Sequence, residues 1–128
     1  MVGKMSYIAS NERLIAHLSG HCGIRDFMVY QFRVFENDNQ KLIADVYLKI
    51  QHKGMLNHVK LRFMDIREYL FHYKDSDYLY YIRVFTHLKD KGIFYFSFDT
   101  RCESDQDEQG RNYIFARAIE GFSFHEDL

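Results

Sequence analysis

The chain has 128 residues, of which 47 % are hydrophobic and 17 % aromatic, and its formal net charge at pH 7 is −1. A chain of this length forms one domain, 1–128, and buries enough surface to fold without a metal ion or a disulfide. The near-neutral charge argues against a general nucleic-acid binder, whose affinity comes mainly from Lys and Arg neutralising phosphates.

No segment has the length of an apolar membrane span, and no signal peptide is visible at the start of the sequence. The sequence has two cysteines, Cys22 and Cys102, and a secreted disulfide scaffold normally carries more. We therefore expect a cytoplasmic protein with reduced thiols and no membrane partner. The sequence leaves open whether these two cysteines pair.

The first structural signal is helical and lies at residues 10–20. Ser10 or Asn11 can cap the first turn, and Gly20 stands where a left-handed C-terminal cap is expected. The spacing of the apolar residues predicts a short helix of about two turns. Its apolar stripe consists of Leu14, Ile15 and Leu18.

Beyond this helix the apolar residues recur with a period of two, which indicates strands. The clearest run has Leu42, Ala44, Val46, Leu48 and Ile50 facing inward and Lys41, Asp45, Lys49 and Gln51 facing outward. In other runs we expect one face to be formed by Met28, Tyr30, Phe32 and Val34, by Tyr80, Ile82 and Val84, and by Phe94, Phe96 and Phe98. The alternation slips near Met64-Asp65 and before Ile119, which suggests bulges. The predicted runs are 24–36, 41–51, 58–74, 78–88, 93–99 and 113–124.

The connections between these runs are short, so neighbouring strands are expected to be antiparallel. The predicted fold class is mainly β, with α+β at the margin. We expect an antiparallel meander of six or seven strands, curled into a sandwich or a half-barrel, with a short N-terminal helix.

Residues 102–112 form the most charged stretch of the chain. If Asp105 occupied the first position of an EF-hand loop, Ala116 would stand where a bidentate Glu is required. The pattern therefore favours a solvated hairpin loop over a calcium site. Residues 49–62 show the opposite bias, with four basic residues and no acid. We interpret them as an ordinary solvated strand face.

Other chemical motifs are weak. His17 and His21 stand four residues apart beside Cys22, a spacing that can hold zinc, but no motif supplies further ligands, and metal binding there stays open. The sequence contains no His-Glu-x-x-His, Cys-x-x-Cys or Gly-x-Ser-x-Gly motif and no glycine-rich phosphate loop. We predict no cofactor, no metal site and no catalytic residue, so the protein is not expected to be an enzyme.

Two segments carry a family resemblance: Phe63-Met64-Asp65-Ile66, where a strand bends, and the closing strand from Ile114 to Gly121. With these segments, residues 21–124 resemble small β-rich bacterial immunity-type proteins of toxin–immunity systems. The resemblance implies a cytoplasmic, non-catalytic protein that binds a cognate toxin domain and neutralises it.

A toxin that acts on nucleic acid needs a basic active site, and an acidic loop can present carboxylates in place of phosphates. The predicted partner-binding residues are accordingly Asp99, Glu103, Asp105, Asp107 and Glu108. Aromatic side chains on a second sheet face would supply anchors for the interface. Two alternatives are a structural or regulatory β-module that acts as a homodimer through an apolar sheet face, and a small-molecule-binding domain.

Overall fold

The structure is a computed structural model that describes residues 5–21, 26–52, 55–71, 80–100 and 112–124. In these ranges the chain forms strands and one α-helix, and all strand pairs are antiparallel. This confirms the predicted mainly-β fold with a short N-terminal helix. The elements are β1 (Ser6–Ser10), α1 (Asn11–His21), β2 (Met28–Glu36), β3 (Leu42–His52), β4 (Met55–Leu70), β5 (Tyr80–Leu88), β6 (Ile93–Thr100) and β7 (Asn112–Phe124).

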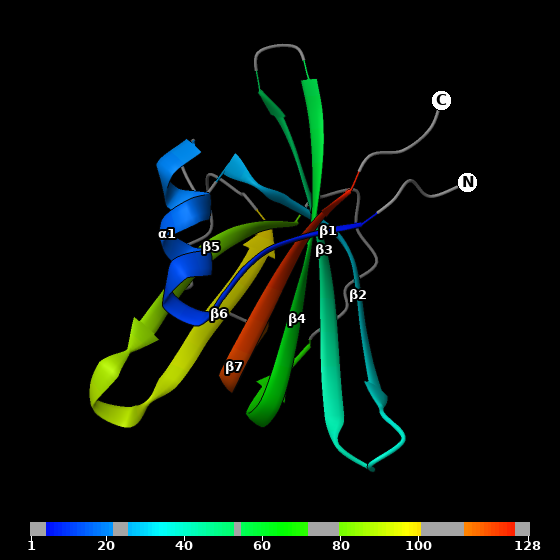
Figure 1. The fold of residues 1–128 in the computed structure, drawn as a ribbon, viewed down its shortest axis with the longest axis vertical. Coiled ribbons are helices and arrows are strands. Elements are labelled where there is room, and N and C mark those ends of the chain that lie inside the picture. The colour runs from blue at the N-terminus through cyan, green and yellow to red at the C-terminus, as the bar shows by residue number, and fades with distance from the viewer. Residues whose placement is uncertain (1–4, 22–25, 53–54, 72–79, 101–111, 125–128) are drawn as a thin grey trace.

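The strands form one sheet in the order β1-β7-β4-β3-β2-β5-β6, and β6 also pairs with β7. Strands β2 to β7 therefore make a closed ring, and β1 is added beside the end of β7. The predicted meander is present as two halves, β2-β3-β4 and β5-β6-β7. It is interrupted between β4 and β5, because β5 pairs with β2 while β4 pairs with β7. Figure 1 shows the β2–β3 and β5–β6 hairpins diverging to opposite sides.

The enclosed side of the sheet holds the hydrophobic core, as the period-two pattern predicted. In β3 the four residues Ala44, Val46, Leu48 and Ile50 are buried, and in β6 all three predicted phenylalanines are buried. The phenylalanine rings of β4, β5 and β6 contact one another across the interior with centroid distances of 5.2–6.3 Å. The rings that fill the interior are Phe32, Phe63, Phe71, Phe85, Phe96 and Phe98.

Helix α1 packs against this core with the predicted stripe: Leu14 and Leu18 are buried and Ile15 is half-buried. The helix has 11 residues and continues through Gly20, so it does not end at that residue. Asn11 adopts a φ of 52°, and its side-chain oxygen accepts a hydrogen bond from the Ile119 backbone N–H at 3.0 Å. Asn11 thereby ties the start of the helix to β7.

Irregular register decides which side chains face the core. The predicted slip near Asp65 is confirmed by its φ of 51° and by a register shift between Ile66 and Glu68. The prediction that Ile82 and Val84 share a face is wrong, because the register also shifts between these two residues and leaves Val84 41 % exposed.

A second such correction concerns β2, where Tyr30 was expected to share a face with Phe32 and Val34. The register of β2 shifts between Val29 and Gln31. As a result Val29 is buried in the core cluster with Phe32 and Val34 packed against it, whereas Tyr30 turns outward to His58 of β4.

A cationic and aromatic outer face as the candidate functional site

The outward positions of β2, β3, β4 and β7 line up in rows, because antiparallel pairing sets their side chains opposite one another. One row runs from Arg33 through Asp45 and Arg62 to Glu120. The next runs through Gln31, Tyr47, Lys60, Phe122 and Tyr7. The third contains Met28, Lys49, His58 and Phe124. We call the surface formed by these three rows the outer face.

The first row is built on a bidentate ion pair. Arg62 donates from Nε to Asp45 Oδ1 and from Nη2 to Asp45 Oδ2, each at 2.9 Å. The Asp45 side chain is 1 % exposed and that of Arg62 is 35 % exposed, so the carboxylate depends on this partner far more than the guanidinium does. The hydrogen bond to Asp45 also raises the pKa of Arg62. The guanidinium groups of Arg33 and Arg62 lie over the Phe35 ring, at 4.6 and 5.8 Å from its centroid.

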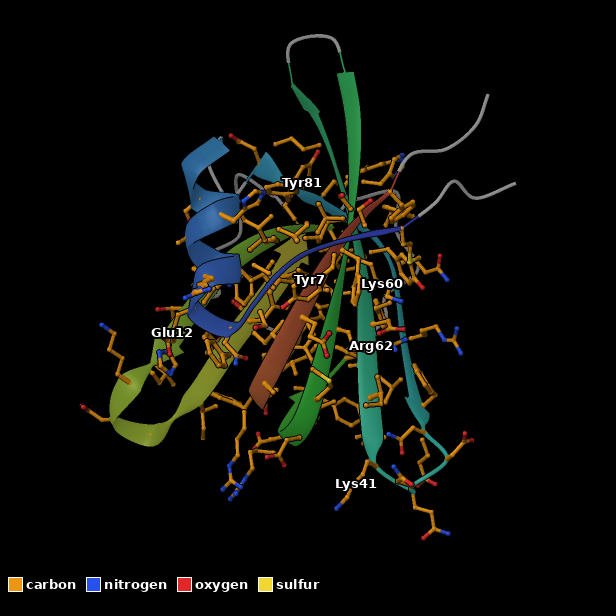
Figure 2. The ribbon with its side chains drawn as sticks, viewed as in Figure 1. Tyr7, Glu12, Lys41, Lys60, Arg62 and Tyr81 are labelled. Atoms are coloured by element: carbon orange, nitrogen blue, oxygen red, sulfur yellow. The ribbon has the colours of Figure 1, made fainter. Side chains whose placement is uncertain are left out.

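The second row places a lysine between aromatic rings. The Lys60 ammonium lies 5.2 Å from the centroid of Phe122, and Phe122 makes an edge contact with Tyr7 of β1 at 5.8 Å. Figure 2 shows Lys60, Arg62 and Tyr7 near one another in this part of the sheet. Lys60 is only 9 % exposed. Burial lowers its pKa below the usual value, the charges of Arg62 and Arg33 act in the same direction, and Asp45 opposes them.

The third row is an aromatic cluster around His58. The His58 ring lies 5.1 Å from Phe124 and 5.7 Å from Tyr30, and Tyr47 contacts both Tyr30 and Phe124. Tyr30 Oη lies 3.3 Å from His58 Nδ1. The Lys49 ammonium sits 5.4 Å from the centroid of the Tyr30 ring. His58 and Phe124 are buried although both belong to the outer face.

Charge is distributed unevenly over the outer face. In the first row two arginines stand beside two acids, so the row is balanced. The second and third rows contain Lys60 and Lys49 and no acid. The outer face therefore offers an excess of positive charge among aromatic rings, a combination suited to an acidic surface on a partner.

Of the residues predicted to bind a partner, only Asp99 lies in the described part of the chain. It is in β6, directly after Phe98, and it is 5 % exposed. Its carboxylate is therefore not on the open surface. Glu103, Asp105, Asp107 and Glu108 lie outside the described residues, as do Cys22 and Cys102.

The histidine and cysteine set at the end of α1 is only partly described. His17 is exposed on the helix, and nothing is described for the side chain of His21 or for Cys22. Across the described ranges, no group of three or more His, Cys, Asp or Glu side chains is arranged to hold a metal ion. No helix in these ranges combines the length and apolar character needed to cross a membrane.

The outer face was not predicted from the sequence, although one signal for it was present. The basic bias of residues 49–62 is visible in the sequence, but it indicated only a solvated strand face. Two of those residues, Lys60 and Arg62, instead pack against the acid and aromatic side chains of neighbouring strands. The sequence signal that could have predicted this surface is the occurrence of cationic and aromatic residues at outward positions of successive strands.

The protein is thus a closed antiparallel sheet whose outer face carries cationic and aromatic side chains. The chain matches no protein-family model, no curated protein and no solved structure.

Proposed function

We propose that this protein is a non-catalytic binding protein that docks onto another protein through its outer face. The partner, as the resemblance to immunity-type proteins implies, is a bacterial toxin domain that the chain neutralises in the cytoplasm. The observation that supports this function most is the set of cation–aromatic pairs on the outer face. Tyr, Phe and Arg side chains are enriched in the cores of protein interfaces, and Tyr and Arg are also frequent among the residues that contribute most binding energy.

The filled interior supports recognition on an outer surface. Large rings such as Phe63, Phe96 and Phe98 are fully buried inside the closed sheet. A small-molecule binder of this architecture would instead keep a ligand cavity inside the sheet or at its mouth. The described interior thus favours a macromolecular partner over a small ligand.

A second candidate is self-association along β1. In the described sheet β1 is an end strand that pairs with β7, and its other edge is available for pairing. Tyr7 of β1 is 57 % exposed. A second copy could add to this edge, because an unpaired strand edge is a template for pairing with another chain.

The proposed function is tested in two steps with the full chain. The tagged chain is used as bait in an extract of the source organism, and the retained protein is identified by mass spectrometry. The retained domain is then expressed in a bacterial host with and without the chain. We expect growth arrest by the domain alone and recovery of growth on co-expression.

Two variants of the outer face, Tyr7→Ser and Phe122→Ser, are compared with Val84→Ser, which alters an exposed residue of β5. Circular dichroism establishes that each variant is folded. Loss of retention and of protection in the first two, with both kept in Val84→Ser, is the expected result. A retained domain that is harmless to the host, or equal retention by all variants, would contradict the proposal. Sedimentation velocity of the chain alone tests the dimer.

A further inference from the structure

In the described part of the chain, the middle of the outer face holds a lysine without an ion pair and a buried histidine nitrogen without a hydrogen-bond partner. Lys60 is 9 % exposed and His58 is 5 % exposed. Within the described residues no carboxylate forms an ion pair with Lys60, and His58 Nε2 has no hydrogen-bond partner. Burial of a charge or of an N–H group is unfavourable unless an oppositely charged group or an acceptor compensates for it.

The nearest acid does not fill this role. Both carboxylate oxygens of Asp45 accept hydrogen bonds from Arg62, which leaves Lys60 with only the longer-range attraction of that carboxylate. Arg33 and Arg62 add further positive charge around Lys60. The centre of the outer face thus has more positive than negative charge.

His58 adds a polar ring beside this charge, although its Nε2 atom is covered. When the Tyr30 hydroxyl donates to His58 Nδ1, the hydrogen of the neutral imidazole lies on Nε2. His58 and Lys60 stand two residues apart on one face of β4, a separation of about 7 Å along a strand. Because Nε2 is covered, a partner's carboxylate would meet Lys60 and not this nitrogen.

We propose that Lys60, with His58 beside it, is the receptor site for an acidic side chain of the partner protein. This inference rests on the proposed function and names the chemistry of the contact: a Glu or Asp carboxylate that pairs with the Lys60 ammonium. The aromatic rings of Phe122, Tyr47 and Phe124 surround the contact and shield it from water.

The outer face favours a carboxylate of a protein over the phosphates of a nucleic acid. Asp45 and Glu120 lie in the adjacent row and would repel a polyphosphate that crosses the strands. Lys60 is a single, mostly covered side chain, whereas nucleic-acid affinity requires several phosphates to be neutralised in succession. The chain as a whole is also not basic, with a net charge of −1.

The test uses an acetylated hexaglutamate peptide as a probe, with a hexalysine peptide, a short single-stranded oligothymidylate and inorganic phosphate as comparisons. The signals of Lys60 Cε and of the His58 ring are followed by heteronuclear NMR in the full chain. We expect hexaglutamate to shift both sets of signals and to raise the pKa of Lys60, because a bound carboxylate stabilises the ammonium.

Lys60→Met should weaken hexaglutamate binding by about tenfold or more, as expected when one member of a shielded charge pair is removed. Lys91→Met is the matched control, since Lys91 is an exposed lysine in the turn before β6, and it should bind as the wild type does. Equal shifts at exposed lysines and at Lys60 would overturn the proposal. So would tighter binding of the oligothymidylate or of phosphate than of the peptide.

The same variants separate this inference from the proposed function. If the bait retains its toxin domain with Lys60→Met as well as with the wild type, and hexaglutamate does not bind, the acidic contact is wrong and the binding function stands. If hexaglutamate binds at Lys60 but no toxin domain is retained, the proposed function fails while the carboxylate site remains.

Discussion

The ion pair between Asp45 and Arg62 offers a quantitative test, because its two members differ in exposure. Asp45 is 1 % exposed and Arg62 is 35 % exposed. Arg62→Met would leave a carboxylate that water cannot reach. Removal of one partner of a buried pair destabilises a protein by about 3–5 kcal/mol. We expect about 3 kcal/mol here, because Lys60 still attracts the carboxylate and Arg33 stands opposite Asp45 in β2.

The reverse change should be milder. In Asp45→Asn the guanidinium of Arg62 loses its charged acceptor, but it is one-third exposed and can be rehydrated. We expect a loss of about 1–2 kcal/mol. The double variant should lose less than the sum of the two single changes, by about 1 kcal/mol or more, because each single change already removes the same contact.

Urea unfolding followed by far-ultraviolet circular dichroism gives the free energy of unfolding of each variant. The control is Arg117→Met, because Arg117 and Asp65 form an exposed pair at 3.7 Å, with side chains 52 % and 59 % exposed. This control should change stability by less than about 0.5 kcal/mol. A greater loss in Asp45→Asn than in Arg62→Met, or an equally large effect of Arg117→Met, would refute this account of the pair.

Three further changes test other parts of the structure. In Gly121→Ala the new methyl group would lie 2.2 Å from Leu14 Cδ1, and Leu14 is fully buried. We expect a loss of about 1–3 kcal/mol in urea unfolding, and a smaller loss from the same change when it is made in the Leu14→Ala variant. Burial lowers the pKa of Lys60, so between its folded pKa and the ordinary value of 10.5 the unfolded chain binds more protons than the folded chain. The free energy of unfolding should therefore increase as the pH rises through this window. The difference in unfolding free energy between wild type and Lys60→Met should show this increase, and a pH-independent difference would contradict it. Gly92 has a φ of +62°, and a methyl group added there would meet no other side chain or backbone of the described residues within 4 Å beyond the adjacent residues. Gly92→Ala should therefore lower the free energy of unfolding by only about 1–2 kcal/mol, from backbone strain. Thermal unfolding should show a smaller loss of stability for Gly92→Asn.

The strands could be predicted because each depends on a local pattern. The run at 41–51 became β3, Leu42–His52, and four of its five predicted inward residues, Ala44, Val46, Leu48 and Ile50, are buried. The helix was found for the same reason, from the spacing of Leu14 and Leu18. The pairings of β7 with β4 and of β5 with β2 could not be predicted, because they join segments far apart in the chain and a period of two does not identify a neighbour.

The outer face was harder to foresee than the core for a related reason. Asp45 and Lys49 were correctly expected on the outward side of β3, but Asp45 was expected in solvent and is instead covered and bound by Arg62. That contact depends on the register of β3 against β4, which places Asp45 opposite Arg62. The acidic residues at 103–108 stood out in the sequence because they are close together, whereas the cations of the outer face are dispersed over three strands.

The packing of these cations bears on how the outer face would bind. Lys60 lies over Phe122, Lys49 lies over Tyr30, and Arg62 is held by Asp45. A long side chain that is ordered only on association loses about 0.5–1.5 kcal/mol of binding free energy as conformational entropy. On this face much of that ordering has already taken place during folding. A partner carboxylate therefore meets a charge already in position, and Phe122→Ser should weaken binding by loosening Lys60 as well as by removing an aromatic contact.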